Sequence, residues 1–198
     1  MEISDQPIHE LKKHIDKIAL LSSEAWEDLE SIVRISEMKN EEFLFKKGTR
    51  ATDEVFLVSG ILRGFYRSYD GEEVNVAFYV ERSVLPPHYF RTKNMISQLN
   101  IQALSDAILV VFNTDQFSAL RYKHESLMQY GNVIVERELE FKTQREILLL
   151  TEHAEERYKT FRIMYPGLEN HISQYHIASY LGITPVSLSR IRKGLVRK

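Results

Sequence analysis

Residues 172–195 read ISQYHIASYLGITPVSLSRIRKGL, and this stretch decides the fold. Ser173 can cap a first helix, because its hydroxyl can accept a hydrogen bond from an unpaired N–H of the first turn. Gly182 follows, where a left-handed backbone ends a helix without a Cβ clash. Thr184 can cap a second helix whose first residue is Pro185, a position where the missing N–H costs nothing. The stretch therefore predicts two short helices joined by a tight turn.

The second of these helices carries polar and cationic side chains. Val186, Leu188 and Ile191 supply its apolar positions. The residues left to project outward are Ser187, Ser189, Arg190, Arg192 and Lys193. Two short helices around a Gly-containing turn are typical of a DNA-binding helix-turn-helix, whose second helix enters the major groove. An ordinary helical hairpin shares this spacing, but the hydroxyls of Ser173 and Thr184 suit phosphate oxygens and favour DNA.

The distribution of charge also favours a polyanionic partner. Residues 155–198 carry eight Lys/Arg and three Glu, a balance of +5, which leaves −7 for the first 154 residues of a chain with net charge −2. No acidic residue occurs from Asn170 onward, and the cations at the end include Arg197 and Lys198. Such clusters gain affinity by displacing counterions from phosphates. A solvated basic tail is the alternative interpretation.

Composition excludes several classes of protein. The 198 residues suffice for one ordinary domain or two small ones, and 43% hydrophobic with 27% charged residues is typical of a soluble globular chain. No run of 18 apolar residues occurs, and the N-terminus MEISDQPIHELKKHID lacks the apolar core of a signal peptide. The absence of cysteine excludes disulfides, thiolate zinc sites and cysteine-ligated iron–sulfur clusters. We therefore expect a cytoplasmic protein without a membrane partner.

Short β-rich runs fill the part of the chain from residue 42 to 112. They are FLF (43–45), EVFLV (54–58), ILRGFYRSY (61–69), EVNVAFYV (73–80), QLNIQAL (98–104) and AILVVF (107–112). Many short strands at even spacing predict a β-sandwich or β-roll, and Asp70-Gly71 predicts a type I′ hairpin turn. Upstream, residues 8–21 predict an amphipathic helix, and a second helix is expected after the cap Ser23.

After Asn113-Thr114-Asp115 the pattern becomes helical and stays so to residue 152. Apolar residues recur in it every seven positions, at Leu120, Leu127, Ile134, Phe141 and Leu148. A seven-residue repeat keeps one stripe facing a partner helix over several turns. We therefore predict a two-fold dimer through Leu127, Ile134, Phe141 and Leu148. The alternative is that every stripe packs inside one monomer.

Taken together, these features resemble the cyclic-AMP receptor / fumarate-nitrate regulator (CRP/FNR) superfamily of bacterial transcription factors. The motifs F-x-x-G (45–48), V-S-G-I-L-R (58–63), the Asp70-Gly71 hairpin, the long helix and I-A-S-Y-L-G-I-T-P-x-S-L-S-R-I-R-K (177–193) fall in family order and span nearly the whole chain.

The resemblance implies an α+β fold in three parts. Residues 1–113 would form N-terminal helices and a double-stranded β-helix, a jelly roll like that of cyclic-nucleotide-binding domains. Residues 114–152 would form the dimerisation helix, and residues 153–198 the helix-turn-helix domain. Because the sequence ends at Lys198, we expect the β-wing after the recognition helix to be truncated or absent. A homodimer on an inverted-repeat operator, in contact with RNA polymerase, is implied as well.

The resemblance also assigns roles to single residues. Ser173, Thr184 and Ser187 would contact phosphates, and Arg190 would read a guanine edge. Ser189, Arg192 and Lys193 complete the expected DNA-binding set. Pro185 and Val186 stand where other members place base-contacting residues, so the operator sequence does not follow from the resemblance.

The effector site departs from the family pattern. Members that bind cyclic AMP carry a Gly-Glu pair and a later Arg-Ser pair, whereas the matching positions here are Pro86-Pro87 and Ser97-Gln98. Without an arginine for the phosphate or a carboxylate for the ribose, we expect no meaningful affinity for cyclic AMP or cyclic GMP. Any effector is expected to be a different small molecule near Pro86, Pro87, Ser97 and Gln98, and no cofactor is expected.

Two other functions remain as alternatives. A cupin-type enzyme would share the β-roll, but its metal site needs His and carboxylate side chains that converge on one sheet. Of the seven His residues only His88 lies in the strand-rich region, and no H-x-H pair occurs. We therefore expect no catalytic residue, no metal site and no enzyme activity. The second alternative is a sensor or interaction module that does not bind DNA.

Overall fold

The computed structural model describes residues 6–196. The chain forms two compact units that are each discontinuous in sequence. The first unit comprises Met1–Arg63 and Phe78–Leu139, and the second comprises Gly64–Ala77 and Glu140–Lys198. The division falls within the long helix rather than at its ends, and it assigns a hairpin of the β-rich region to the second unit. Each unit is described by itself.

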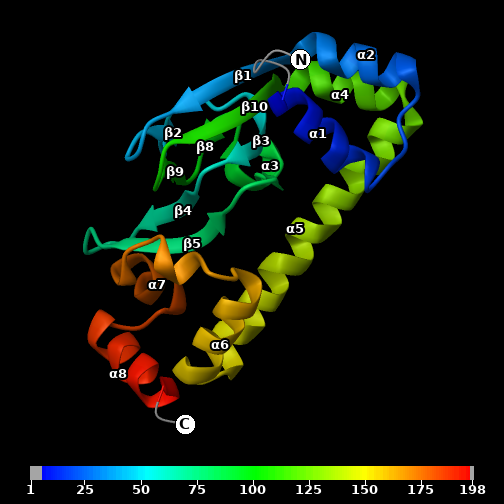
Figure 1. Ribbon diagram of the computed structural model, residues 1–198. Helices are drawn as coiled ribbons and strands as arrows, with labels where there is room; N and C mark the ends of the chain where they lie inside the picture. The colour runs from blue at the N-terminus through cyan, green and yellow to red at the C-terminus, as the bar shows by residue number, and fades with distance from the viewer. Residues whose placement is uncertain (1–5, 197–198) are drawn as a thin grey trace. The chain divides into compact units, whose positions relative to one another are not determined.

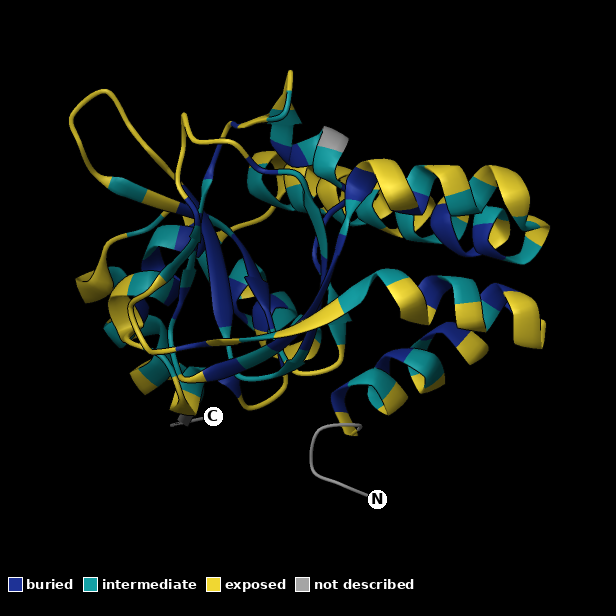
Figure 2. Cartoon of the chain, turned by 90° about the horizontal axis from the view of Figure 1, so that it is seen from above, coloured by how far each residue is buried: buried dark blue, intermediate teal, exposed yellow. Residues whose placement is uncertain are grey.

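An antiparallel sheet forms the centre of the first unit. Its strand order is β1 (Val33–Met38), β10 (Ala107–Asn113), β3 (Asp53–Ser59) and β6 (Ser83–Val84). The register pairs Val33 with Phe112 and Val110 with Phe56, so alternate side chains of neighbouring strands share one face. β3 and β10 contribute most of the buried residues of this sheet, whereas Met38 is the one buried residue of β1; Figure 2 colours buried residues dark blue.

A second sheet has the order β2 (Phe43–Phe45), β9 (Asn100–Ala103), β4 (Leu62–Arg67) and β5 (Glu73–Tyr79). The short helix α3 (His88–Arg91) precedes a two-stranded ribbon of β7 (Thr92–Lys93) and β8 (Ile96–Ser97). Each of the six predicted β-rich runs contains a strand, so the predicted β-roll is confirmed. β1 was not predicted, because it follows a helix directly and no turn residue marks its start.

The hairpin turn between β4 and β5 differs from the prediction. The N–H of Gly71 donates to the carbonyl of Ser68 at 3.1 Å, and the N–H of Ser68 donates to the carbonyl of Glu72 at 2.8 Å. Gly71 has φ +84°, whereas Asp70 is not left-handed. The turn therefore spans Ser68 to Gly71 with a left-handed glycine at its end, and the type I′ assignment is wrong.

Four helices pack on one face of the first sheet. They are α1 (Gln6–Asp16), α2 (Ser23–Ile32), α4 (Thr114–Lys123) and the start of α5 (Glu125–Thr151), and Figure 1 shows α1, α2 and α4 together near one end of β1 and β10. The shared core consists of Leu11, Ile15, Ala19, Leu29, Phe56, Val110, Phe112, Phe117, Leu127 and Tyr130.

Two helix boundaries correct the sequence-based expectation. The cap of α2 is Ser22, whose Oγ accepts from the N–H of Ala25 at 3.1 Å, and Ser23 is already helical. The predicted single helix after Asn113 is two helices, because His124 has an extended backbone. Asp28 on α2 fixes this break, since its carboxylate lies 2.6 Å from His124 Nε2 and 2.7 Å from Lys123 Nζ.

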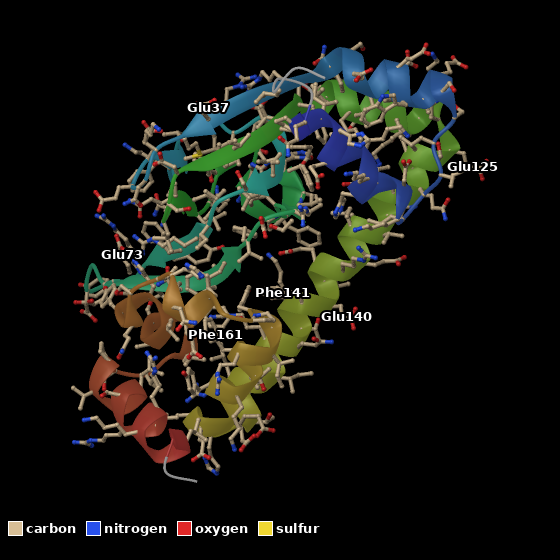
Figure 3. The ribbon with its side chains drawn as sticks, in the orientation of Figure 1. Glu37, Glu73, Glu125, Glu140, Phe141 and Phe161 are labelled. Atoms are coloured by element: carbon tan, nitrogen blue, oxygen red, sulfur yellow. The ribbon has the colours of Figure 1, made fainter. Side chains whose placement is uncertain are left out.

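The seven-residue stripe on α5 does not form one continuous exposed face. Leu127 is fully buried in the core described above, and Ile134 packs against that core. These two residues therefore pack inside one monomer, which was the alternative interpretation. The prediction that Leu127 is a dimer contact is wrong, because the residue is fully buried in the single chain. Phe141 and Leu148 are half-buried, and Figure 3 shows Phe141 and Glu140 on opposite sides of the helix.

The second unit ends in three helices and a short 3-10 turn. These are α6 (Ala154–Met164), the turn Leu168–Asn170, α7 (Gln174–Leu181) and α8 (Pro185–Val196). α8 is the last element of the described residues 6–196, and the expectation about the wing stays a prediction. Within the same residues, no helix combines the length and apolar character needed to cross a membrane.

Candidate nucleic-acid interface

The turn between α7 and α8 has the predicted capping groups. Ser173 Oγ accepts from the N–H of Tyr175 at 3.1 Å, and Gly182 ends α7 with φ +65°. Thr184 Oγ1 accepts from the N–H of Ser187 at 3.1 Å and lies 2.9 Å from its hydroxyl. Pro185 is the first residue of α8. The two predicted helices and their caps are therefore confirmed.

An aromatic cluster fixes α7 and α8 on α6. The ring of Phe161 lies 5.4 Å from that of Tyr165 and 5.8 Å from that of Tyr180, which are common distances for packed aromatic pairs. Leu188 of α8 is fully buried in the same unit. Sequence reasoning missed α6 and this cluster, although Tyr158, Phe161 and Tyr165 recur at helical spacing. The cluster gives α8 a rigid support.

One face of α8 is exposed and cationic. Val186, Arg190 and Lys193 are spaced i, i+4 and i+7, and all three are exposed. Ser187 and Ser189 flank them and are half-buried. In the described part of the chain neither Arg190 nor Lys193 forms an ion pair, so both charges are available to a partner. The two terminal cations noted in the sequence, at positions 197 and 198, lie outside the described residues.

Arg192 departs from the predicted set. It is half-buried, and its charge acts on the pKa of Tyr158, so it faces α6. The hydroxyl of Tyr158 donates to the carboxylate of Glu169. Burial, with the nearby Glu169 carboxylate, raises the pKa of Tyr158 to about 12, an effect that Arg192 opposes. Arg192 therefore lies on a different side of α8 from Arg190.

A hairpin segment of the second unit contacts α7, which sequence reasoning did not foresee. Asn75 is fully buried, and its Nδ2 donates to the carbonyl of His176 at 3.2 Å. Arg145 Nη2 donates to the carbonyl of Asn75 at 3.2 Å and to that of Tyr180 at 3.3 Å. The sequence did contain a signal for this contact, because Asn75 is a polar residue flanked by Val74 and Val76 in the predicted strand EVNVAFYV.

Two of the four residues expected at an effector site bond to Arg91, since the backbone N–H of Gln98 donates to the carbonyl of Arg91 at 2.8 Å and the Arg91 side chain bonds to Pro86. Ser97 Oγ donates to the carbonyl of Leu99 at 2.8 Å, and Gln98 is exposed. The carbonyl of Pro86 accepts from Arg91 Nε at 3.0 Å. Pro87 lines a pocket, whereas Pro86, Ser97 and Gln98 do not line that pocket.

Among the described residues, one group has the spacing of metal ligands. It consists of Glu24, Asp28 and His124, which lie on or beside α2 and α4 rather than on a sheet. Lys123 Nζ already lies 3.0 Å from Glu24 and 2.7 Å from Asp28, and an ammonium there opposes a second cation. His88, the one His of the strand-rich region, lies 3.1 Å from Glu54. This arrangement does not resemble the His-rich site of a cupin.

Comparison with known proteins places the fold. No family model matches the sequence, and no curated protein matches it. FixK2 from Bradyrhizobium japonicum has a similar structure, with a TM-score of 0.74 at 18% identity over 84% of this chain and 85% of that chain. CLP from Xanthomonas campestris, a c-di-GMP-responsive global regulator, gives 0.70 at 11% identity over 89% and 92%. A protein assigned to the CRP/FNR family, from Eubacterium rectale, gives 0.70 at 15% identity over 89% and 85%.

Proposed function

We propose that this chain, which has the fold of the CRP/FNR regulators, is a sequence-specific DNA-binding transcription regulator. The observation that carries the proposal is the exposed face of α8, where Arg190 and Lys193 stand without ion pairs from described residues. A helix of this kind, supported by a second helix across a tight turn, fits the major groove. The guanidinium of Arg190 would then meet O6 and N7 of a guanine.

Phosphate contacts would come from the two helix N-termini. The hydroxyls of Ser173 and Thr184 lie at the starts of α7 and α8, where backbone N–H groups also favour anions. Ser187, Ser189 and Lys193 would add further contacts from the flanks of α8. Arg192 would stabilise the packing of α8 on α6 and contribute less to DNA binding. Phosphate contacts orient the protein, and base contacts select the sequence.

A homodimer would present two copies of α8 to the operator. The large apolar residues of α5 that are exposed in one chain are Leu139, Ile147 and Leu150, with exposed fractions of 57%, 54% and 78%. With the half-buried Val135 they span about a third of the helix circumference. Exposed apolar groups on one face mark an interaction surface. We assign the dimer contact to this face, in place of the stripe through Leu127.

A dimer of this kind would bind an inverted repeat in the bacterial cytoplasm and would act on transcription through RNA polymerase. No catalytic role is proposed. Selection of bound duplexes from a random pool tests the proposal. Enrichment of an inverted repeat with half-sites about 10 base pairs apart is expected. If the folded protein enriches no sequence, the alternative of a sensor or interaction module without DNA binding holds.

A further inference from the structure

A pocket in the first unit lies where α4 and α5 meet β3, β6 and β10. It has a cavity volume of about 80 Å³ and is open to solvent on one side, so a ligand would only be partly enclosed. Most of its wall is apolar, and Val84, Phe112, Phe117 and Ile134 contribute to it. A ligand that fills this space would therefore have an apolar body.

One cation in the wall lies close against α5. Arg121 of α4 lies over Gly131, since a Cβ built on Gly131 would come within 2.4 Å of Arg121 Nε and 2.7 Å of its Cζ. Arg121 Nη2 donates to Asn132 Oδ1 at 3.0 Å. Its Nε is buried and has no hydrogen-bond partner among the described residues. A buried donor without an acceptor is costly, so an anionic oxygen near Arg121 would be stabilised.

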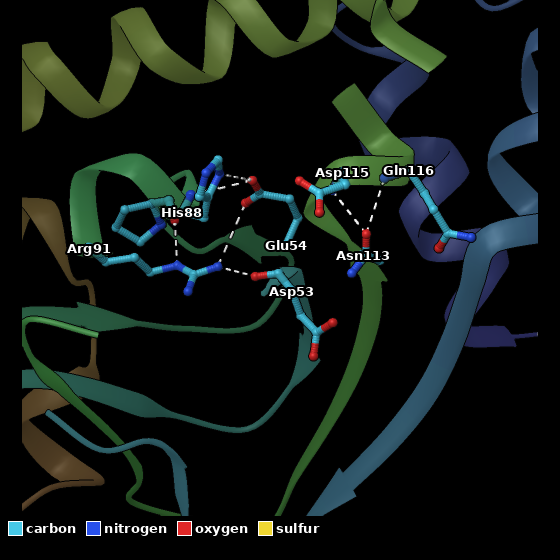
Figure 4. A network of polar contacts seen from close by, with 8 residues as sticks. Asp53, Glu54, His88, Arg91, Asn113, Asp115 and Gln116 are labelled. Carbon is cyan, nitrogen blue, oxygen red and sulfur yellow. Dashed lines mark hydrogen bonds and ion pairs between the residues drawn. The ribbon is translucent and has the colours of Figure 1, made fainter. Parts of the chain in front are cut away.

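The negative charge of Glu54, the carboxylate in the same wall, already has partners within the protein. Glu54 accepts from the backbone N–H of His88 at 3.3 Å, and its Oε1 lies 3.1 Å from His88 Nδ1 (Figure 4). The guanidinium of Arg91 lies 3.8 Å from the other oxygen, and the Arg91 side chain is 1% exposed. Arg91 therefore offsets the charge of Glu54, and Arg121 sets the sign of the charge that the pocket favours.

We propose that this pocket binds a small organic acid. The carboxylate would pair with Arg121, and an aromatic or branched apolar body would lie against Phe112 and Phe117. Tyr130 and Ile134 of α5 line the pocket as well, so the ligand contacts the helix assigned to the dimer. An effect of the ligand on the dimer, and through it on DNA binding, rests on the proposed function, whereas the binding of the acid does not.

The test uses the full chain without DNA and matched pairs of acids and amides. The pairs are phenylacetate and phenylacetamide, 3-methylbutanoate and its amide, and octanoate and its amide, each titrated by calorimetry. At least one acid is expected to bind at least about tenfold more tightly than its amide. Arg121→Gln should reduce the affinity for that acid to the level of the amide. Arg137→Gln removes the same charge from an exposed position of α5 outside the pocket, and should change the affinity less than about twofold.

A second variant keeps the charge and moves it. Gly131→Ala forces the Arg121 guanidinium away from α5 while it favours the helix, so the acid should bind more weakly to a folded protein. The proposal is overturned if acids and amides bind equally, or if Arg121→Gln binds the acid like the wild type. It is also overturned if no acid binds at millimolar concentration to protein that circular dichroism shows to be folded. Preferential binding of cyclic AMP would overturn it too. Because no DNA is present, each of these results leaves the proposed DNA binding untouched.

Discussion

The backbone N–H of Asn75 donates to the hydroxyl of Ser179 at 3.0 Å, and that hydroxyl donates in turn to the carbonyl of Glu73 at 2.6 Å. One side chain of α7 therefore satisfies a donor and an acceptor of β5, and Asn75 is fully buried beside it. A buried polar group that loses its partner retains its full desolvation cost. Ser179 is accordingly a structural residue of the second unit, although it lies within the helix-turn-helix motif.

Ser179→Ala should lower the local stability of α7. The change removes the hydroxyl that bonds to the N–H of Asn75 and to the carbonyl of Glu73, and the loss of these two hydrogen bonds costs about 1–3 kcal/mol, which exceeds the gain in helix propensity. Hydrogen exchange of residues 174–181 should accelerate by about tenfold or more. Gln174→Ala, at an exposed position of the same helix, is the control. Unchanged protection in the Ser179 variant would show that the contact contributes nothing.

Leu139→Lys should dissociate the proposed dimer. Leu139 is exposed in a single chain, so the monomer should keep its fold, whereas a lysine buried at the interface without a partner costs several kcal/mol. Analytical ultracentrifugation should show dimer for the wild type and monomer for the variant. Gln144→Lys adds the same charge at an exposed position outside the apolar face and should remain dimeric. A dimer that survives Leu139→Lys would place the interface elsewhere.

The first unit should lose stability in mild acid through His14. Its ring lies 5.2 Å from Phe56 and 6.1 Å from Tyr130, measured between centroids, and Nε2 has no partner among the described residues. Burial, together with the charges of Arg137 and Lys17, holds the pKa of His14 below its ordinary value of 6.5. The unfolded chain therefore takes up a proton at a pH where the folded chain does not.

The stabilisation from neutral His14 is consequently present above pH 6.5 and is lost as the pH falls below it toward the pKa of the folded state. Between pH 7.5 and 5.5 the free energy of unfolding should fall more steeply in the wild type than in His14→Gln. The exposed His9, changed to Gln, serves as the control. Parallel curves for the wild type and His14→Gln would contradict this role of the histidine.

The features that were predicted correctly depend on neighbours in sequence. Ser173 and Thr184 bond to groups two or three residues away, and Gly182 needs only its own backbone freedom. The β-roll followed from the spacing of turns and strands for the same reason. Residue types at short separation fix such signals, and distant packing changes them little.

The errors concern contacts between distant segments. Leu127 belongs to the predicted stripe, but its partners include Leu11 and Leu29, about 100 residues away in sequence. A seven-residue spacing places residues on one face without saying which surface covers that face. Likewise, the resemblance assigned Ser97 to an effector site, whereas its hydroxyl donates to the carbonyl of Leu99. The pocket beside Arg121 depends on Gly131, a relationship that only the packed helices reveal.

Fluorescence anisotropy on a selected duplex and a scrambled duplex, across several salt concentrations, tests the central claim most directly. Arg190→Ala should cost about 1–3 kcal/mol on the selected duplex and little on the scrambled one. Lys193→Ala should weaken both similarly and reduce the salt slope by about one. Equal losses on both duplexes would remove Arg190 from base reading. A wild-type protein that is folded and binds neither duplex would contradict the assignment of α8 as a DNA-reading helix.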